Sequence, residues 1–225
     1  MKLLILRLEG ALQSWGEHSK WDDRDTGLFP TKSGIVGLIA CAMGLPRDSD
    51  EIARLASGLR LCIRADRPGT VLSDYHTVQG MPDILTSDGK KRGSNTIVST
   101  RRYLQDASFL AVLSGPDDLL SRCAAALRDP VWQTYLGRKA CVPSVPLLPV
   151  LTDSYDSEDD ALCHYKACDR CSLNAPLCMI EDADGMGERV DQPLGHRRFA
   201  RRHFTYRRIE LSKEGEEQTH VSDKV

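Results

Sequence analysis

The stretch DTGLFPTKSG, residues 25–34, runs directly into IVGLIACAMGL, residues 35–45, and these two segments decide the fold. A turn with Gly and Pro precedes an apolar run that is too long for an ordinary strand, so the run predicts a buried helix. Thr31 or Ser33 is expected to cap the helix, because a side-chain oxygen there can accept a bond from an unpaired backbone amide. Close packing of one helix face against a sheet is predicted from three small residues at helical spacing, Gly34, Gly37 and Cys41.

The beginning of this helix is a candidate anion site. Unpaired amides, the positive end of the helix dipole and the ammonium of Lys32 would meet there. The segment is not a nucleotide-binding P-loop, because Lys32-Ser33 lack the preceding glycine and Gly27 is one residue too close. Nucleotide hydrolysis is therefore not expected. The helix end could still capture a phosphate, for which an RNA backbone is as good a ligand as ATP. The alternative is a capped core helix with a solvated lysine.

The charges are unevenly distributed along a nearly neutral chain. The 225 residues carry a formal net charge of −2, so the total charge does not indicate a nucleic-acid partner. Acidic residues gather at 153–160 and 181–191, and arginines at 101–102 and 197–208. This separation predicts a basic surface on a neutral protein.

Membrane insertion and secretion are not expected. The apolar run is well short of the roughly 20 residues that span a membrane. Arg7 interrupts the apolar N-terminus and no small-residue cleavage site follows, which excludes a signal peptide. The expected location is cytoplasmic, so the eight cysteines are interpreted as reduced thiols or metal ligands.

The order of predicted elements indicates the fold class. They are strand 2–9, helix 34–45, helix 48–57, strand 59–65, hairpin 72–103, strand 108–113, helix 117–128 and strand 135–141. This order is typical of an elaborated ferredoxin-like (RRM-like) fold of the α+β class. Prolines at 143, 146 and 149 mark a boundary between a domain at 1–148 and a small β-rich C-terminal subdomain at 149–225.

The predicted hairpin protrudes, with a basic tip, and carries Tyr75 and His76 on one arm and Arg101 and Arg102 on the other. A His, a Tyr and a cation can cleave RNA without metal, by activating a 2′-hydroxyl and stabilising the developing charge. The same groups can instead stack on a base and bind phosphate without chemistry. A third interpretation is that Tyr75 and His76 only cover the base of the hairpin.

A cysteine cluster follows the boundary. Cys168 and Cys171 form a C-x-x-C pair that suits two thiolates on one structural zinc ion, and Cys163, His164 or Cys178 would complete the tetrahedron. The spacing also resembles part of a ferredoxin-type iron–sulfur run, whose fourth cysteine would lie farther on. The alternative is a set of unligated thiols. No cofactor is required by the predicted function.

The C-terminal segment 197–211 interleaves arginines with Phe199, Phe204 and Tyr206, a composition typical of nucleic-acid surfaces. The alternative is a strand whose aromatic side chains face the core. Its arginines, Arg197 included, would then face water or pair with the acidic residues upstream.

Several phrases in order resemble one family. They are LRL (6–8) with QSWG (13–16), TGLFPTKSG (26–34), DYHTV (74–78), YLQDASF (103–109) and YLGRKAC (135–141). They resemble the RAMP-superfamily subunits of type I-E CRISPR Cascade complexes that hold the 5′ end of the guide RNA. The resemblance covers residues 1–149 well and the remainder only loosely, and the cysteine cluster matches no pattern of the family.

The resemblance implies a ferredoxin-like RAMP body with a hairpin thumb at about 74–105, bound to the 5′ handle of the CRISPR RNA. It implies a non-catalytic antiviral subunit that caps the backbone subunits beside the large subunit and meets target DNA only through the complex. Relatives in type I-C systems cleave precursor RNA, so a metal-independent endoribonuclease is the alternative, and a pure protein adaptor is a third class. The RNA-binding residues expected are Trp15, Thr31, Lys32, Ser33, Gly34, Tyr75, His76, Arg101, Arg102, Arg138 and Lys139.

Overall fold

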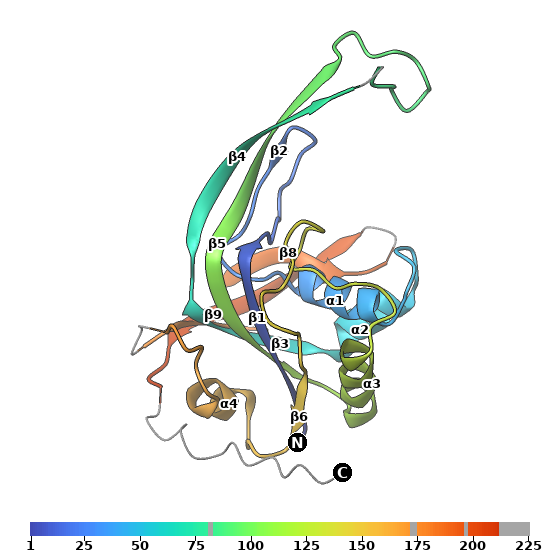
Figure 1. Ribbon diagram of the computed structural model, residues 1–225. Helices are drawn as coiled ribbons and strands as arrows, with labels where there is room; N and C mark the ends of the chain where they lie inside the picture. Colours follow the sequence, from blue (N-terminus) through green and yellow to red (C-terminus); the bar gives the residue numbers. More distant parts are fainter. Residues whose placement is uncertain (81–82, 172–174, 196–197, 212–225) are drawn as a thin grey trace, which may run out of the picture.

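The computed structural model of the chain describes residues 1–80, 83–171, 175–195 and 198–211. Its helices are α1 (Lys32–Ala42), α2 (Glu51–Gly58), α3 (Asp117–Arg128) and α4 (Glu158–His164). Its strands are β1 (Leu3–Gln13), β2 (Asp23–Arg24), β3 (Arg60–Arg67), β4 (Thr70–Gln79), β5 (Thr96–Ser114), β6 (Val150–Thr152), β7 (Leu177–Glu181), β8 (Gly187–Pro193) and β9 (Phe199–Arg208). The class is mixed helix and strand, as expected (Figure 1).

One large sheet organises the molecule. Its strand order is β6-β1-β5-β3-β7-β9-β8, with β2 and β4 pairing to β5 off this path. Every neighbouring pair along the path is antiparallel. The C-terminal strands β7, β9 and β8 extend the same sheet through β3, so the proline-rich boundary near residue 149 divides the chain but not the sheet.

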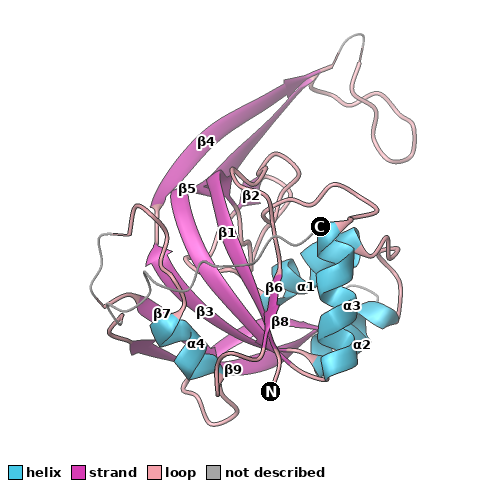
Figure 2. Ribbon diagram, turned by 60° about the horizontal axis from the view of Figure 1, so that its bottom comes forward, coloured by secondary structure: helices cyan, strands magenta, loops and turns pink. Residues whose placement is uncertain are grey.

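The two faces of the sheet are covered by different helices (Figure 2). Alternate residues of β1 point to opposite faces. Leu4, Leu6 and Leu8 enter a core with α1, α2 and α3, whereas Leu3 and Ile5 enter a second core with α4. The longest helix among the described residues, α3, has 12 residues. No helix in the described part of the chain is long and apolar enough to cross a membrane.

The central helix α1 begins as predicted but packs differently. Thr31 is the N-cap and accepts a bond from the amide of Gly34. The face with Gly34, Gly37 and Cys41 does not pack on the sheet, so that prediction was wrong: a Cβ on Gly37 would meet no atom within 4 Å. The β-branched and leucine side chains on the other faces, Ile35, Val36, Leu38 and Ile39, fill the core instead.

The predicted strand at 135–141 is absent. The Leu136 amide donates to the Cys141 carbonyl oxygen at 2.8 Å and closes a turn, within which Gly137 has a φ of +88°. The strand that pairs with the free edge of β1 is β6, farther along the chain. The sequence pattern failed here because a glycine in the left-handed region ends a strand that its apolar neighbours favour.

A long, bent hairpin is formed by β4 and the first half of β5, residues 96–105 (Figure 1). The predicted arms are present, but the arm at 96–103 and the strand at 108–113 form one continuous strand, β5. The bend coincides with positive φ angles at Gly69 (+73°) and Asp106 (+56°). A side chain at Gly69 would come within 2.6 Å of the Gln105 carbonyl oxygen, so the close approach of the two strands requires glycine.

Candidate nucleic-acid interface

The N-terminus of α1 is occupied by the protein's own carboxylates. The backbone amide of Lys32 donates to Asp191 Oδ2 at 2.8 Å, and the Lys32 ammonium lies 2.8 Å from Glu181 Oε1. The Lys32 side chain is only 3% exposed. The prediction that this helix end offers free amides and an available lysine to a phosphate was therefore wrong. Asp191 already supplies the negative charge that the helix dipole favours.

Asp191 belongs to a buried charge cluster with Arg202. Arg202 donates from Nε and Nη2 to the two carboxylate oxygens at 2.9 and 2.8 Å. Burial by itself would raise the pKa of Asp191, but the bonds and charge of Arg202 and the Lys32 amide outweigh it, and the pKa lies below its ordinary value. Burial lowers the pKa of Lys32 against the opposing effect of Glu181. The cluster joins β8 and β9 to α1.

Trp15, Thr31 and Ser33 have structural roles in and beside the hydrophobic core. The Trp15 ring is 1% exposed. Its Nε1–H donates to Gln13 Oε1 at 3.0 Å, and the ring lies against Gly34. Thr31 is buried as the helix cap, and Ser33 is half-buried with its hydroxyl toward Thr31. In this fold, the side chains of Trp15 and Thr31 are therefore too enclosed to stack on a base or hold a phosphate.

The hairpin separates residues that the sequence places together. Successive side chains of a strand point to opposite faces. The register sets Asp74 opposite Arg101, and His76 lies two residues along on the same face. Tyr75 and Arg102 lie on the other face. Tyr75 and His76 therefore cannot act together on one ligand atom at this site.

Two other predicted residues have internal partners. Arg102 forms an ion pair with Asp23 at 2.8 Å. Arg138 donates to the Arg102 carbonyl oxygen at 3.1 Å, and its guanidinium carbon lies 4.9 Å from the centre of the Tyr103 ring. Both arginines thus help to join the hairpin to the body. Lys139, the next residue, is exposed.

The sequence interpretation missed Trp21 and Arg24. The strand β2 pairs parallel with β5 and sets Arg24 beside Arg101. Trp21 is 72% exposed, and the Arg24 guanidinium carbon lies 5.9 Å from the centre of its ring. The Arg24 Nε is buried and has no hydrogen-bond partner among the described residues. The signal that could have found them is an aromatic residue between Lys20 and Arg24 in a polar loop.

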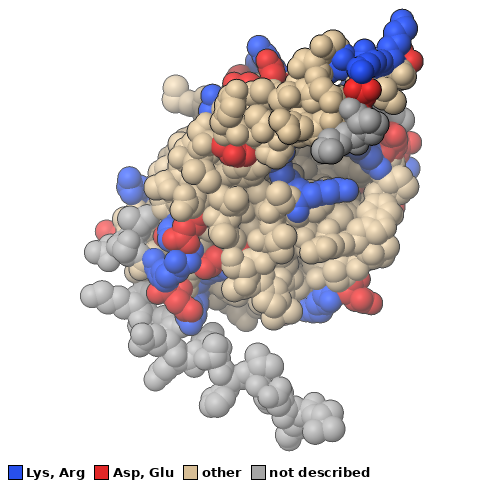
Figure 3. Space-filling model, turned by 45° about the horizontal axis from the view of Figure 1, so that its top comes forward, with Lys and Arg blue, Asp and Glu red and all other residues tan. Residues whose placement is uncertain are grey.

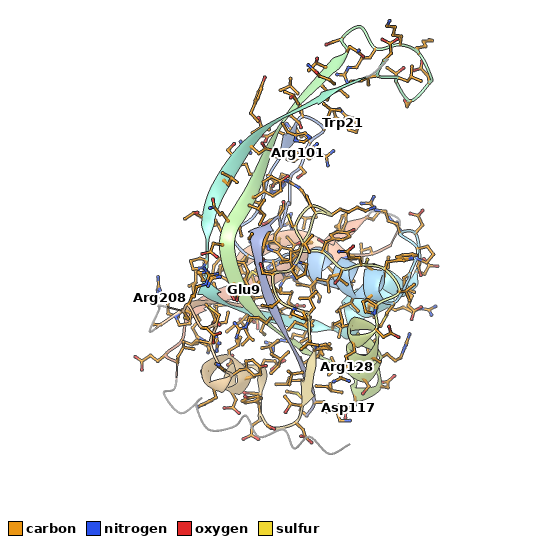
Figure 4. The ribbon with its side chains drawn as sticks, viewed as in Figure 1. Glu9, Trp21, Arg101, Asp117, Arg128 and Arg208 are labelled. Atoms are coloured by element: carbon orange, nitrogen blue, oxygen red, sulfur yellow. The ribbon has the colours of Figure 1, made fainter. Side chains whose placement is uncertain are left out.

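Trp21, Arg24, His76 and Arg101 define a surface that we call the hairpin-base surface. Figure 4 shows Trp21 and Arg101 near one another where β2 lies alongside β5. The Arg101 Nε donates to the hydroxyl of Ser99 at 3.3 Å rather than to a carboxylate. Arg24 and Arg101 are partners in the strand pairing, and neither forms an ion pair with a carboxylate among the described residues, so this surface can accept an anionic ligand. Figure 3, a view with the hairpin end turned forward, shows basic side chains in a hollow of a largely uncharged face.

The cysteines predicted to bind metal are distributed over α4, the loop that follows it and β7. Within the described part of the chain, no group of three or more His, Cys, Asp or Glu side chains is placed to hold a metal ion. Cys178 is buried in β7, where burial raises the pKa of its thiol to about 12. The segment is held instead by Asp66, whose carboxylate accepts from the Cys168 amide at 2.9 Å, and by Arg64, which donates to the Leu162 carbonyl oxygen.

The C-terminal arginines follow the alternative interpretation. Arg202 is buried with Asp191, Arg201 pairs with Glu188 at 3.3 Å, and Arg207 pairs with Asp159 at 2.7 Å. Phe204 packs into the core. Phe199 and Tyr206 are 46% exposed. Arg197 lies outside the described residues. Strand β9 is therefore chiefly part of the sheet. Three of its arginines pair with acidic residues upstream, and Arg208 donates to the Ala175 carbonyl oxygen.

Comparison with known proteins agrees with this architecture. The chain matches the family described as CRISPR-associated protein (Cas_Cas5) over residues 3–210. The chain belongs to this family. A curated relative, the CRISPR system Cascade subunit CasD of Escherichia coli (strain K12), is 33% identical over 175 residues, covering 72% of this chain and 76% of the relative.

Two solved structures resemble the chain over most of its length. A chain of a CRISPR RNA-guided surveillance complex superposes with a TM-score of 0.78 at 32% identity, covering 93% of this chain and 90% of that one. A second, described as a crystal structure of a Cas protein, has a TM-score of 0.70 at 35% identity, covering 92% and 95%. The family resemblance predicted from the sequence is confirmed: the family match and these relatives agree with it.

Proposed function

We propose that the chain binds the 5′ handle of the CRISPR RNA through the hairpin-base surface and performs no bond-making. The observation that carries this proposal is the pairing of Arg24 with Arg101, two neighbouring cations beside the exposed ring of Trp21. Single-stranded RNA suits such a surface, because phosphates meet the arginines while an unstacked base meets the aromatic ring.

Within the assembly, the subunit caps one end of the row of backbone subunits and contacts the large subunit, meeting target DNA only through the complex. The similarity to a chain of an RNA-guided surveillance complex supports this role. The order β6-β1-β5-β3, antiparallel throughout, supports a ferredoxin-like RAMP body, and the bent β4–β5 hairpin supports the thumb. The expected site of action is the cytoplasm, and no cofactor is required.

The geometry argues against the endoribonuclease alternative. A metal-independent cleavage site needs its acid, base and cation around one phosphate. His76 and Tyr75 lie on opposite faces of the hairpin. The His76 ring is 3.5 Å from Asp74, its neighbour two residues away. We therefore expect no product when the purified chain meets a repeat-hairpin RNA in EDTA, and cleavage abolished by His76→Ala would contradict the non-catalytic role.

The test of binding replaces Arg24 and Arg101 by Ala, singly and together, and measures affinity for handle RNA at fixed salt. Removing each charge-assisted hydrogen bond to the RNA should weaken binding about tenfold. The slope of affinity against salt should fall by about 0.7 for each phosphate that the variant no longer neutralises. The matched control is Arg54→Ala, which removes an exposed arginine of α2. Unchanged affinity and salt slope in the double variant would refute the proposed surface.

A further inference from the structure

The loop from Val131 to Cys141 is anchored both to α1 and to the chain just after β1. The Val131 amide donates to the carbonyl oxygen of Ala42, the last residue of α1, at 2.8 Å. The Ser14 amide donates to the Leu136 carbonyl oxygen at 3.1 Å. Gly137 lies so close to the backbone of Ser14 that a Cβ at this position would be 1.7 Å from the Ser14 carbonyl oxygen. These contacts fix the loop, so a site built on it is formed before any ligand arrives.

A hollow of about 350 Å³ lies between this loop and α1 and is lined by Cys41, Trp132, Gln133, Thr134, Tyr135 and Lys139. We call it the Trp132 pocket. Trp132 is 48% exposed, which is high for a tryptophan. The Cys41 thiol donates to the Gln133 carbonyl oxygen at 3.4 Å and closes one side. No carboxylate is among these lining residues of the described chain.

The helix surface beside the pocket is open. Gly37 lies one turn before Cys41 on the same face of α1 and is exposed. A Cβ there would meet no atom within 4 Å. Glycine in a helix interior weakens the helix relative to alanine, and it allows a ligand to approach the backbone closely.

We infer that the Trp132 pocket takes one unstacked base of single-stranded RNA, stacked on Trp132 with its adjoining phosphate at Lys139. This inference rests on the proposed function and names a second contact for the same RNA. The pocket is at the lower end of the roughly 300–1,000 Å³ range of ligand sites, which suits one base rather than a larger molecule. Gln133 and Thr134 can bond to the edge of a base.

Arg138, the neighbour of Lys139 in the chain, joins the loop to the root of the hairpin. Its guanidinium donates to the carbonyl oxygens of Arg102 and Asp25, at 3.1 and 2.8 Å, at the root of the hairpin. The chain therefore presents Lys139 immediately beside the residue that joins the loop to the hairpin. A strand of RNA that leaves Arg101 can follow this basic connection to the pocket.

The chemistry favours a base over an apolar side chain of a partner protein. An apolar group would bury Gln133, Thr134 and the Lys139 ammonium without offering them hydrogen-bond partners, which costs free energy. A base brings a flat ring for Trp132 and polar edges for these groups, and the phosphate brings the opposite charge for Lys139. Another hollow, of about 530 Å³, is lined by Lys32, Arg60, Arg201 and Arg202 as well as by Glu181 and Asp182. Each of these four cations is already paired with a carboxylate of the chain, so this hollow suits RNA less well.

The test measures the full chain binding oligoadenylate of about eight nucleotides, a length within the usual site size for single strands. The same measurement uses an abasic ribose-phosphate oligomer of equal length. Trp132→Ala should weaken oligoadenylate binding about tenfold and leave abasic binding unchanged, since stacking is removed and charge is not. Trp132→Phe should keep most of the affinity. Leu148→Ala, at a side chain that is 69% exposed, is the control.

A second variant keeps the test valid if Trp132→Ala does not fold. Gly37→Leu adds a side chain to an exposed helix position where a Cβ would meet no atom within 4 Å, so the variant should fold. The added side chain narrows the approach to the pocket and should also weaken oligoadenylate binding. Wild-type affinity for oligoadenylate in both Trp132→Ala and Gly37→Leu would overturn the inference. The proposed function would still be tested independently by the Arg24 and Arg101 variants. Normal RNA affinity with reduced recovery of partner subunits would make the pocket a protein contact and equally overturn it. Failure of the wild-type chain to bind handle RNA would instead refute the proposed function.

Discussion

Replacing Asp191 by Ala should destabilise the fold strongly, because one carboxylate satisfies two elements at once. It accepts from the Lys32 amide at 2.8 Å and from Arg202 Nε and Nη2 at 2.9 and 2.8 Å. The variant leaves the Arg202 guanidinium, 3% exposed, with Glu181 at 3.7 Å as its remaining carboxylate. It also leaves the first amide of α1 unpaired.

The expected destabilisation follows from these contacts. Removing one partner of a buried ion pair costs about 3–5 kcal/mol, since the other charge stays buried. The energies of the three hydrogen bonds should not be added to this figure, because the bonds share one carboxylate and their contributions are not additive. For a chain of this length, each kcal/mol lowers Tm by roughly 2–4 °C, so the variant should melt about 6–20 °C below the wild type.

The assay is thermal unfolding followed by circular dichroism, with Asp48→Ala as the control because Asp48 is an exposed aspartate. The control should shift Tm by no more than about 2 °C, as expected for a surface change within about 0.5 kcal/mol. A destabilisation below about 1 kcal/mol in Asp191→Ala, comparable with the control, would refute the reasoning that this carboxylate holds α1 to β8 and β9.

Three further outcomes are expected. The pKa of Asp191 is lowered in the folded chain. The stability that its ionised carboxylate contributes is therefore complete above the unfolded pKa of about 3.9 and is lost as pH falls through the folded pKa. The difference in free energy of unfolding between wild type and Asp191→Asn should accordingly shrink in acid. A difference that grows as pH falls would contradict this sign. Gly37→Ala should raise stability by about 0.5–1 kcal/mol in chemical denaturation, because the added methyl meets no neighbour within 4 Å; a decrease in stability would mean that this helix face is packed. Chelation of metal should leave Tm unchanged, since Asp66 and Arg64 hold the cysteine segment by hydrogen bonds; one zinc ion per chain with a fall in Tm on chelation would contradict it.

The local features of the fold could be predicted from the sequence because their causes are local. The Thr31 cap and the apolar run of α1 need only their neighbours along the chain. Most strands and helices up to residue 128 were also predictable, although the two-residue strand β2 was missed and two predicted strands form the single strand β5. At residues 135–141, one glycine angle outweighed the apolar pattern. The family resemblance rested on several motifs in order, and the comparisons confirm it.

The binding residues were harder to predict because partners come from distant parts of the chain. Lys32 was interpreted as free because Glu181 and Asp191 lie 149 and 159 positions away. Arg24 was missed because its place beside Arg101 depends on the pairing of a two-residue strand with β5. The separation of Tyr75 from His76 is different: adjacent strand residues face opposite ways, so their sequence alone contained that information.

Ultraviolet crosslinking of the full chain to its bound guide RNA, followed by mass spectrometry of the peptides, tests the proposed RNA surface most directly. We expect crosslinks at the hairpin-base surface, on peptides that contain Trp21, Arg24, His76 or Arg101. We expect none on the peptide spanning 31–34, where the Lys32 side chain is 3% exposed and paired with Glu181. Crosslinks concentrated at 31–34, with none at the hairpin-base surface, would contradict the proposal.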